Sequence, residues 1–368
     1  MSARKRILDL MALLTSGLGI LALGGIIALS AGSPVALGQS TEQPIAHIRI
    51  FMYHRFGESD YPSTSVRLDQ FEAHLAELKS GGYKVIPLPE AVKALRNNTP
   101  LPEKAVAITI DDAYLSVYEQ AWPRLREAGF PFTLFVSTDP VDRGFRGMMT
   151  WDQIRELAAA GVTIANHSAS HPHMPLLSDE RRRREIARAN ARFEKELGKV
   201  PEIFAYPYGE YGVAEKKAVR DAGFIAAFGQ QSGVAFAGHD MYALPRFALN
   251  ENYAGIARFR TLLRALPLPV RDVTPEETVL RGQNPPLFGF TLIRDLPRTD
   301  ALRCYPSNSA QPARIQRLGK RRFEIRLDKP FPPGRSRINC TMPTRDGRWR
   351  WFGRQFYIPK DKTASSAQ

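Results

Sequence analysis

Two short motifs carry residues that suit metal-assisted hydrolysis. Asp111 and Asp112 close one apolar run, while His167 and His171, four residues apart, follow another. One carboxylate and two imidazoles suit a catalytic zinc with an open coordination position, and the second carboxylate then remains free to act as a base. An isolated pair of histidines at this spacing usually has no function. Here, however, three of the seven histidines of the chain (His167, His171 and His173) fall within seven residues, which favours a functional cluster.

Both motifs follow segments that are expected to be buried strands. The runs 105–110 and 162–165 are short, apolar and rich in β-branched residues, as strands of a parallel sheet are. Enzymes of the α/β class carry their chemistry at the carboxyl ends of such strands. The cap of a helix expected at 114–128 would explain one aspartate well and a pair of aspartates less well.

Strand-like and helix-like segments alternate with short connections over most of the chain. This alternation is typical of βαβ units. It predicts an α/β fold, a distorted and incomplete (β/α) barrel over residues 41–264, with an open doubly wound sheet as the alternative.

A change of pattern marks the C-terminal part. Prolines punctuate residues 265–286, which are expected to be a linker, and residues 287–360 show short strand-like runs with Pro and Gly turns. These runs predict a small all-β, sandwich-like domain, followed by a disordered tail at 361–368. The pair Cys304 and Cys340 predicts a disulfide within this domain, with two free thiols as the alternative.

The C-terminal part is also strongly basic. Residues 271–360 hold 19 Lys and Arg against 8 Asp and Glu, out of a net charge of +14 for the chain. Such a concentration of positive charge attracts an anionic polymer or a membrane surface. Nucleic acid is the least favoured ligand, because the N-terminal segment described next indicates export of the chain. Within this part, the run 348–351 (Arg-Trp-Arg-Trp) predicts a strand with Trp inward, or a carbohydrate-binding surface.

Residues 1–40 read as a targeting segment, either a signal peptide or a membrane anchor. Basic residues at 4–6 precede an almost wholly apolar stretch at 10–29. That stretch is long for a cleaved signal and near the length that spans a bilayer. Both interpretations export the rest of the chain, to the periplasm or to the outer face of the cytoplasmic membrane.

The motifs resemble those of the NodB-type polysaccharide deacetylases, carbohydrate esterase family four. The family's Thr-Phe-Asp-Asp-Gly is similar to Thr109-Ile-Asp-Asp-Ala113, and its His-Ser/Thr-x-x-x-His to His167-Ser-Ala-Ser-His171. Its Arg-x-Pro-Tyr-Gly is similar to Ala205-Tyr-Pro-Tyr-Gly209. The opening Met52-Tyr-His-Arg55 resembles the exported subgroup that acts on poly-N-acetylglucosamine. All motifs stand in family order over about residues 48–250.

This resemblance implies a role for each matching residue. Asp111 would be the general base, and Asp112, His167 and His171 the ligands of a divalent metal. The peptide N–H of Tyr208 would help to hold the oxyanion. Zinc suits the ligand set best, although cobalt or nickel also fits it.

Three departures from the family pattern concern the residues around the base. Ala113 replaces a glycine, which is a mild change unless the position needs a positive φ. Ala205 replaces the arginine that usually orients the base. The late Leu-x-His, which supplies the general acid, reads Leu244-Pro-Arg246. We therefore hypothesise that Arg246 replaces the missing guanidinium and fixes Asp111.

The general acid is then open, with His54 and His239 as candidates. His54 is preferred because it follows a predicted strand and should therefore lie at the same end of the sheet as Asp111 and His167. A structural histidine is an equal alternative. Tyr206 and Tyr208 are candidates for stacking on sugar rings, or are core aromatics.

The predicted function is metal-dependent removal of N-acetyl groups from an acetylated polysaccharide. A binding or assembly protein on the same scaffold, and an amidase acting on a small molecule, are the alternatives.

Overall fold

The computed structural model describes residues 45–360. The expected targeting segment at 1–40 and the expected tail at 361–368 therefore lie outside the described residues. Within 45–360, no helix is long and apolar enough to cross a membrane.

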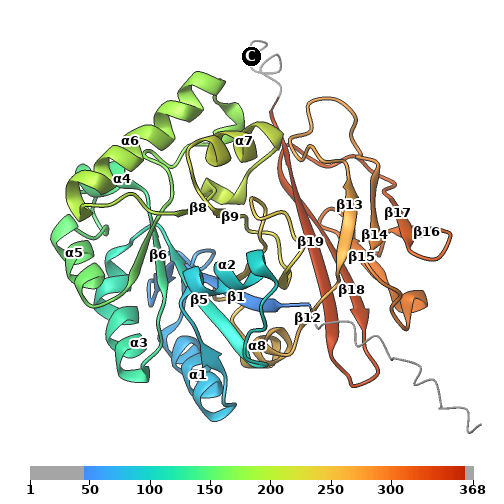
Figure 1. The fold of residues 1–368 in the computed structure, drawn as a ribbon, viewed down its shortest axis with the longest axis horizontal. Coiled ribbons are helices and arrows are strands. Elements are labelled where there is room, and N and C mark those ends of the chain that lie inside the picture. Colours follow the sequence, from blue (N-terminus) through green and yellow to red (C-terminus); the bar gives the residue numbers. More distant parts are fainter. Residues whose placement is uncertain (1–44, 361–368) are drawn as a thin grey trace, which may run out of the picture. The chain divides into compact units, whose positions relative to one another are not determined.

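A curled sheet forms the first part of the structure (Figure 1). Its strands are β1 (His47–Tyr53), β4 (Lys84–Val85), β5 (Ala105–Asp111), β6 (Thr133–Val136), β7 (Thr163–Asn166), β8 (Ile203–Ala205), β9 (Ala226–Phe228), β10 (Ala235–Phe236) and β11 (Phe247–Ala248). Their order is β10-β1-β5-β6-β7-β8-β9, with β11 beside β1 and β4 beside β5. The sheet is parallel except that β10 runs antiparallel to β1. The predicted incomplete barrel is confirmed.

Helices and short turns connect these strands. The helices are α1 (Leu68–Ser80), α2 (Leu88–Asn97), α3 (Trp122–Ala128), α4 (Thr138–Asp142), α5 (Trp151–Ala159), α6 (Asp179–Leu197), α7 (Val213–Asp221) and α8 (Ile256–Leu263). Single-turn elements are the π-helix η1 (Val117–Ala121) and the 3₁₀ turns η2 (Met174–Leu176) and η3 (Pro207–Gly209). A small pair, β2 (Arg55–Phe56) and β3 (Ser65–Val66), follows β1.

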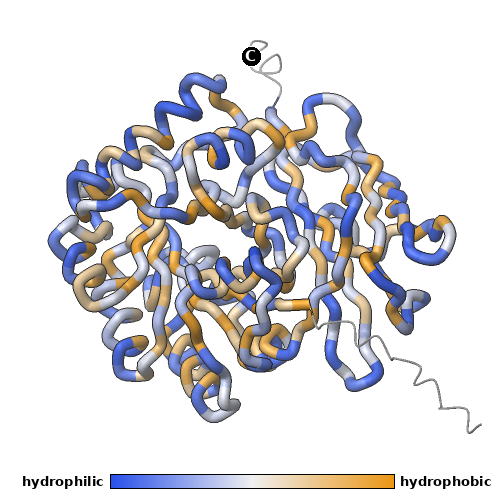
Figure 2. Tube along the Cα trace, viewed as in Figure 1, coloured by the Kyte–Doolittle hydropathy of each residue, from blue (hydrophilic) through white to orange (hydrophobic). Residues whose placement is uncertain are grey.

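The two faces of β5 explain how the sheet curls. Every residue of β5 is buried, as expected for a central parallel strand. One face contributes Val106 and Ile108 to the core under the outer helices, and the other contributes Ala105 and Ala107 to the inner core. These small inner side chains leave room for α2, which packs into the same inner core through Leu88, Val92 and Leu95. Figure 2 shows the resulting pattern, with apolar strands and a hydrophilic outer helix α6.

The helix expected at 114–128 begins instead as the π-helix η1 and continues as α3. Pro123 lies in the first turn of α3 and has no N–H to donate to the carbonyl four residues earlier, so the preceding turn widens. In α6, Ser178 caps the start of the helix and Gly198 ends it in the left-handed conformation.

Two four-stranded sheets form the C-terminal part. One has the order β12-β19-β18-β15 and the other β13-β14-β17-β16. Their strands are β12 (Leu266–Pro267), β13 (Val270–Thr274), β14 (Phe288–Leu292), β15 (Arg303–Pro306), β16 (Arg314–Leu318), β17 (Arg322–Arg326), β18 (Gly334–Pro343) and β19 (Trp349–Ile358), with the 3₁₀ turn η4 (Thr299–Ala301). The predicted all-β part is confirmed, and Cys304 on β15 forms the expected disulfide with Cys340 on β18.

The segment 265–286 is more than a linker, which corrects the expectation. It contributes β12 to one sheet and β13 to the other. Pro267, Pro269 and Pro275 fall at the ends of these strands, and Pro285 and Pro286 precede β14. A missing N–H is tolerated at strand ends, so a high number of prolines does not exclude strands here.

Alternate residues of β19 face the curled sheet. Phe352 and Phe356 belong to the core of the β-part, whereas Trp351 packs on Phe247 of β11 with ring centroids 5.4 Å apart. Gly353 lies so close to the backbone carbonyl of Ser232 that a Cβ would be 2.2 Å from that oxygen. The prediction that Trp349 and Trp351 point into the core of their own domain is wrong: Trp349 is exposed and Trp351 faces the other part of the structure.

Candidate active site

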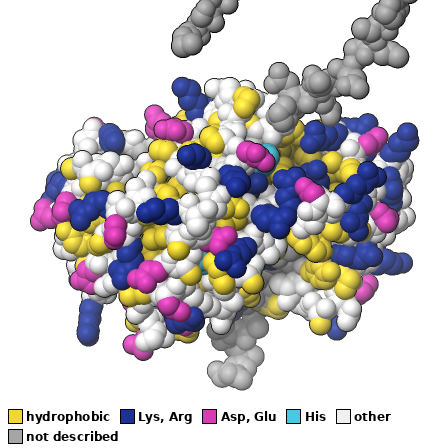
Figure 3. Space-filling view, turned by 90° about the horizontal axis from the view of Figure 1, so that it is seen from below, with side chains coloured by type: hydrophobic (Ala, Val, Ile, Leu, Met, Phe, Trp, Pro, Cys, Tyr) yellow, Lys and Arg dark blue, Asp and Glu magenta, His cyan; other side chains and the backbone are white. Residues whose placement is uncertain are grey.

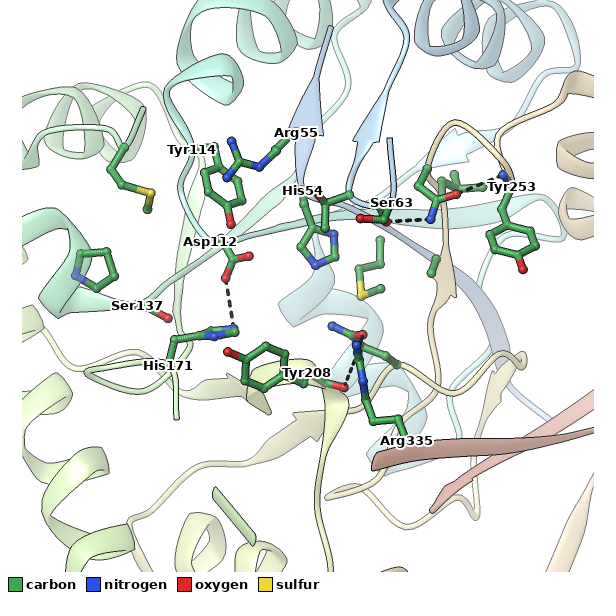
Figure 4. A pocket seen from close by; sticks show the side chains of 18 of the residues that line it. His54, Arg55, Ser63, Asp112, Tyr114, Ser137, His171, Tyr208, Tyr253 and Arg335 are labelled. Atoms are coloured by element: carbon green, nitrogen blue, oxygen red, sulfur yellow. Dashed lines mark hydrogen bonds and ion pairs between the residues drawn. The ribbon is translucent and has the colours of Figure 1, made fainter. Parts of the chain in front are cut away.

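A hollow of about 600 Å³ lies where the parallel strands end (Figure 4). Four of its lining residues come after four different strands: His54 after β1, Asp112 after β5, His171 after β7 and Tyr208 after β8. Parallel strands deliver their carboxyl ends to one edge of the sheet. The fold therefore brings together residues that are far apart in the sequence.

A strained turn after β5 separates the two aspartates. Asp112 has a φ of 79° and Ala113 a φ of 50°, both in the left-handed region. This conformation costs a residue with a side chain about 1–2 kcal/mol, so the replacement of glycine by Ala113 is not mild. The turn directs Asp112 into the hollow, while Asp111 remains fully buried at the end of β5.

Asp112, His167 and His171 converge on one point. Oδ1 of Asp112 lies 3.4 Å from Nε2 of His167 and 3.3 Å from Nε2 of His171. The ligand atoms of all three residues lie within 4.8 Å of one another. This is the set that the sequence proposed for a metal.

The hydrogen bonding of His167 fits a metal at that point. Its Nδ1 lies 2.7 Å from the carbonyl oxygen of Ala205. Because a carbonyl can only accept, Nδ1 carries a proton, and in the neutral imidazole Nε2 is then the nitrogen with the lone pair. Nε2 is buried and has no hydrogen-bond partner among the described residues. A buried polar atom without a partner is costly, and a bound cation would satisfy it.

Electrostatics favour the protonation states that a metal site needs. Burial lowers the pKa of His171 to about 4, although Asp112 opposes this shift, so the imidazole is neutral near pH 7. Burial would raise the pKa of Asp112, but His171 and His167 outweigh it and lower the pKa. A neutral imidazole and an ionised carboxylate are the forms that bind divalent cations.

Arg246 holds Asp111. Its Nη1 and Nη2 donate to the two carboxylate oxygens at 2.7 and 2.8 Å, and Nε donates to the carbonyl of Gly229 at 3.0 Å. Both side chains are fully buried. Burial alone would raise the pKa of Asp111, but Arg246 and then His167 lower it to about 2. The contact that the sequence hypothesis expected is therefore present, and it leaves Asp111 ionised.

The two candidate general acids lie in different places. His54 points into the hollow (Figure 4), and burial lowers its pKa against the pull of Asp111 and Asp112. His239 lies outside this hollow, against Phe236 with ring centroids 4.0 Å apart. His239 is therefore not positioned to act on a group bound beside Asp112.

The two tyrosines of the third motif also differ. Tyr208 lines the hollow and packs edge-on against His171, with ring centroids 4.4 Å apart. Tyr206 is fully buried, and its hydroxyl donates to the carbonyl of Tyr242 at 3.0 Å. The expectation that Tyr206 binds substrate is therefore wrong. Tyr206 has extended backbone, whereas Tyr208 lies in the turn η3 with a φ of 57°, and this turn rather than strand alternation directs the two side chains to different places.

The β-part holds the turn that contains Tyr208. Nε2 of the buried Gln355 on β19 donates to the carbonyl oxygens of Tyr208 and Gly209, at 3.1 and 2.8 Å. Tyr208 has a φ of 57°, and a Cβ on Gly209 would lie 2.5 Å from the backbone nitrogen of Gln230. These bonds hold the turn at Tyr208 and Gly209 in a conformation that the local sequence does not favour.

Sequence reasoning missed three further groups at the hollow. Arg335 and Arg337 reach it from β18, and their alternating spacing is the signal that could have indicated a shared face. The third is Arg55, whose guanidinium lies 3.4 Å from the ring centroid of Tyr114 and pairs with Glu58. Arg55 follows His54 in the sequence and so lies on the same rim.

Comparison with known proteins identifies the family to which the sequence is similar. Residues 98–227 match the sequence pattern of the family described as Polysaccharide deacetylase. YxkH of Bacillus subtilis, named for the same family, is 30% identical over 217 residues, which are 59% of this chain and 76% of that protein. The poly-beta-1,6-N-acetyl-D-glucosamine N-deacetylase of Escherichia coli is 26% identical, over 53% of this chain and 35% of that longer protein.

The fold is also shared with a solved structure. IcaB from Ammonifex degensii superposes with a TM-score of 0.54 at 26% identity, covering 59% of this chain and 97% of that one.

Proposed function

The chain belongs to the polysaccharide deacetylase family, and we propose that it removes N-acetyl groups from an N-acetylglucosamine-containing polysaccharide in a metal-dependent reaction that releases acetate. Family membership identifies it as a deacetylase of the hydrolase class. The metal, the polymer and the residue roles belong to the proposal. Its main support is the convergence of Asp112, His167 and His171 beside the fully buried, ionised Asp111.

A divalent cation fits the three converging residues. Asp112 would provide an oxygen ligand, and His167 and His171 would each provide Nε2. Three protein ligands leave an open position, as catalytic zinc sites do. When bound, such a cation polarises a carbonyl and lowers the pKa of a bound water. Zinc is the first choice, with cobalt and nickel as alternatives.

The neighbouring residues would handle the protons and the developing charge. Asp111, ionised and held by Arg246, would accept a proton from the attacking water. The peptide N–H of Tyr208 would donate to the oxyanion that forms from the acetamide carbonyl, with Gln355 holding the turn in place. His54, which faces the same hollow, would donate a proton to the leaving amine. Arg246 and Gln355 would thus act as positioning residues.

The substrate proposal rests on the relatives and on the volume of the hollow. The Escherichia coli relative is named for poly-beta-1,6-N-acetyl-D-glucosamine. At about 600 Å³, the hollow here can hold a sugar ring with its acetamide. We propose an acetylated polysaccharide of this class as the substrate.

We also propose that the reaction takes place outside the cytoplasm, in the periplasm or at the outer face of the cytoplasmic membrane. The apolar segment within residues 1–40 supports export. The disulfide between Cys304 and Cys340 supports it as well, because disulfides persist in oxidising compartments.

Acetate release from a panel of defined polymers would test the function. The panel includes poly-N-acetylglucosamine, peptidoglycan and a second acetylated exopolysaccharide, each incubated with metal-loaded protein. We expect acetate from at least one polymer, and none above background from Asp111→Asn. A protein that binds metal but releases no acetate from any polymer would instead be a binding or assembly protein. Acetate from small amides alone would indicate an amidase.

A further inference from the structure

Strand β18 places two arginines side by side at the rim of the catalytic hollow. Arg335 and Arg337 are two residues apart, so their side chains leave the strand on the same face. Both line the hollow that also contains Asp112 and Tyr208, and Figure 4 shows Arg335 next to Tyr208. Arg335 Nη1 lies 3.4 Å from the carbonyl oxygen of Tyr208. The β-part therefore forms one wall of the proposed active site.

These two positive charges have little negative charge to balance them. Arg337 is partly buried, and its side chain donates from Nε to Oε1 of the neutral Gln355 at 3.0 Å. Within residues 45–360, no carboxylate forms an ion pair with Arg337. Arg335 Nε lies 3.8 Å from Oε1 of Glu210, too far for a hydrogen bond, and the other oxygen of this carboxylate contacts His173 at 2.7 Å. Glu210 is therefore the single carboxylate that pairs with either arginine among the described residues.

The physical cost of this arrangement points to an anionic ligand. Burial lowers the pKa of Arg337, and the neighbouring charge of Arg335 lowers it further. A partly buried cation beside a like charge is less favourable than a solvated one, and a negative group bound between the two would offset that cost. Arg55, the other arginine described above at this hollow, forms an ion pair with Glu58. Its charge is therefore already balanced, unlike the charge of Arg337. Figure 3 shows that Lys and Arg side chains also gather toward the β-part on the face seen there.

We propose that Arg335 and Arg337 form a subsite for a carboxylate on the sugar that neighbours the acetamido sugar in the hollow. A pair of guanidinium groups matches the planar geometry of a carboxylate. A membrane surface cannot enter a hollow, so it is not the ligand of this pair. The inference rests on the proposed function and narrows its substrate to an acidic polysaccharide. The carboxylate can belong to a uronic acid or to a lactyl ether on the ring.

The test compares acetate release from three sets of oligosaccharides of equal length. One set is neutral N-acetylglucosamine, one alternates it with a uronic acid, and one alternates it with a lactyl-bearing sugar. For the metal-loaded protein we expect kcat/KM to be roughly tenfold or more higher on one acidic set than on the neutral set, since hydrogen bonds to charged groups are the strong ones. The acidic set that is preferred identifies the source of the carboxylate.

Two variants and one control connect the preference to the residues. In Arg337→Gln and Arg335→Gln, the ratio of acidic to neutral kcat/KM should fall toward one. Arg314→Gln removes the same charge from the exposed strand β16, outside the hollow, and should keep the wild-type ratio. A general disturbance of the Tyr208 turn would lower both rates equally and leave the ratio unchanged.

The two levels of the proposal fail in different ways. A wild-type protein that prefers the neutral set, or an equal ratio in wild type and both variants, would overturn the carboxylate subsite while leaving deacetylation intact. No acetate from any of the three sets, nor from other acetylated polymers, would overturn the proposed function itself.

Discussion

Arg246 and Asp111 form a doubly hydrogen-bonded ion pair, at 2.7 and 2.8 Å, in which both side chains are fully buried. The two residues are 135 positions apart in the sequence. The family motif puts the orienting arginine in the position of Ala205, whereas in this chain the arginine that contacts the aspartate directly precedes β11. The pair both ionises Asp111 and fixes the direction in which its carboxylate faces.

Replacing Arg246 with Ala should abolish turnover. The loss would leave Asp111 buried without a partner, which costs about 3–5 kcal/mol in folding free energy and raises its pKa. We expect kcat/KM to fall at least about 100-fold. Arg246→Lys, which keeps the charge but not the fork, should lose less stability than Arg246→Ala and still lose activity. Unchanged turnover in a folded Arg246→Ala protein would contradict the positioning role.

Metal binding should depend on Asp112, His167 and His171, and it should raise the thermal stability of the folded protein. A ligand at 100 times its Kd stabilises the folded state by about 2.7 kcal/mol. Adding zinc to the chelator-treated protein should therefore raise Tm, and Asp112→Asn or His171→Gln should remove the increase. Asp111→Asn, which alters the neighbouring carboxylate, should retain it. An equal increase in all variants would place the metal elsewhere.

Gln355→Leu should lower kcat more than it changes KM. The substitution keeps a similar volume but removes both hydrogen bonds that hold the carbonyls of Tyr208 and Gly209. It also removes the acceptor of Arg337 Nε, so kinetics on a neutral substrate isolate the effect on the turn. A misplaced oxyanion donor affects the transition state more than substrate binding, and losses on the order of 100-fold are typical. Gln316→Leu on exposed β16 is a control that should leave both constants unchanged. A rise in KM with kcat intact would instead assign Gln355 to substrate binding.

The buried His74 should make the fold sensitive to acid. Its Nε2 lies 2.8 Å from the carbonyl of Ala254 and its Nδ1 lies 3.0 Å from the hydroxyl of Tyr53. Burial lowers its pKa from 6.5 to about 4, so the unfolded chain binds the proton more readily than the folded protein. The stabilisation is complete above pH 6.5 and is lost as the pH falls toward 4, by up to about 3 kcal/mol.

Urea unfolding of the wild type and of His74→Gln between pH 4 and pH 8 would measure this effect. The difference in unfolding free energy between the two proteins should shrink as the pH falls from 6.5 to 4. Parallel curves over that range would show that His74 does not carry the acid sensitivity.

The sequence predicts the curled sheet and the metal-binding candidates because both depend on local patterns. The apolar run before Asp111 and the run before His167 predict strands, and strand ends meet at one edge of a parallel sheet. Arg246 could be proposed because the family pattern leaves one arginine missing and one extra. The burial of Tyr206 could not be foreseen from the sequence. Tyr208, two residues later, has the same side chain, and only the path of the turn between them decides which of the two faces the hollow.

The contribution of the β-part lay beyond sequence reasoning for a different reason. Gln355 is 147 residues from Tyr208, and nothing in the local pattern of β19 says which surface it will cover. Arg335 and Arg337 read as ordinary charges on the polar face of a strand. Their importance follows from how β18 and β19 pack on the curled sheet, which depends on close contacts such as that of Gly353 with Ser232.

The most direct test of the central claim is acetate release by metal-loaded wild type and metal-loaded Asp111→Asn on the same acetylated glucosamine polymer. Metal content is measured in both samples by elemental analysis. The account predicts equal metal content, acetate release by the wild type and a loss of at least about 100-fold in the variant. Equal acetate release by the two proteins would contradict the assignment of Asp111 as the base.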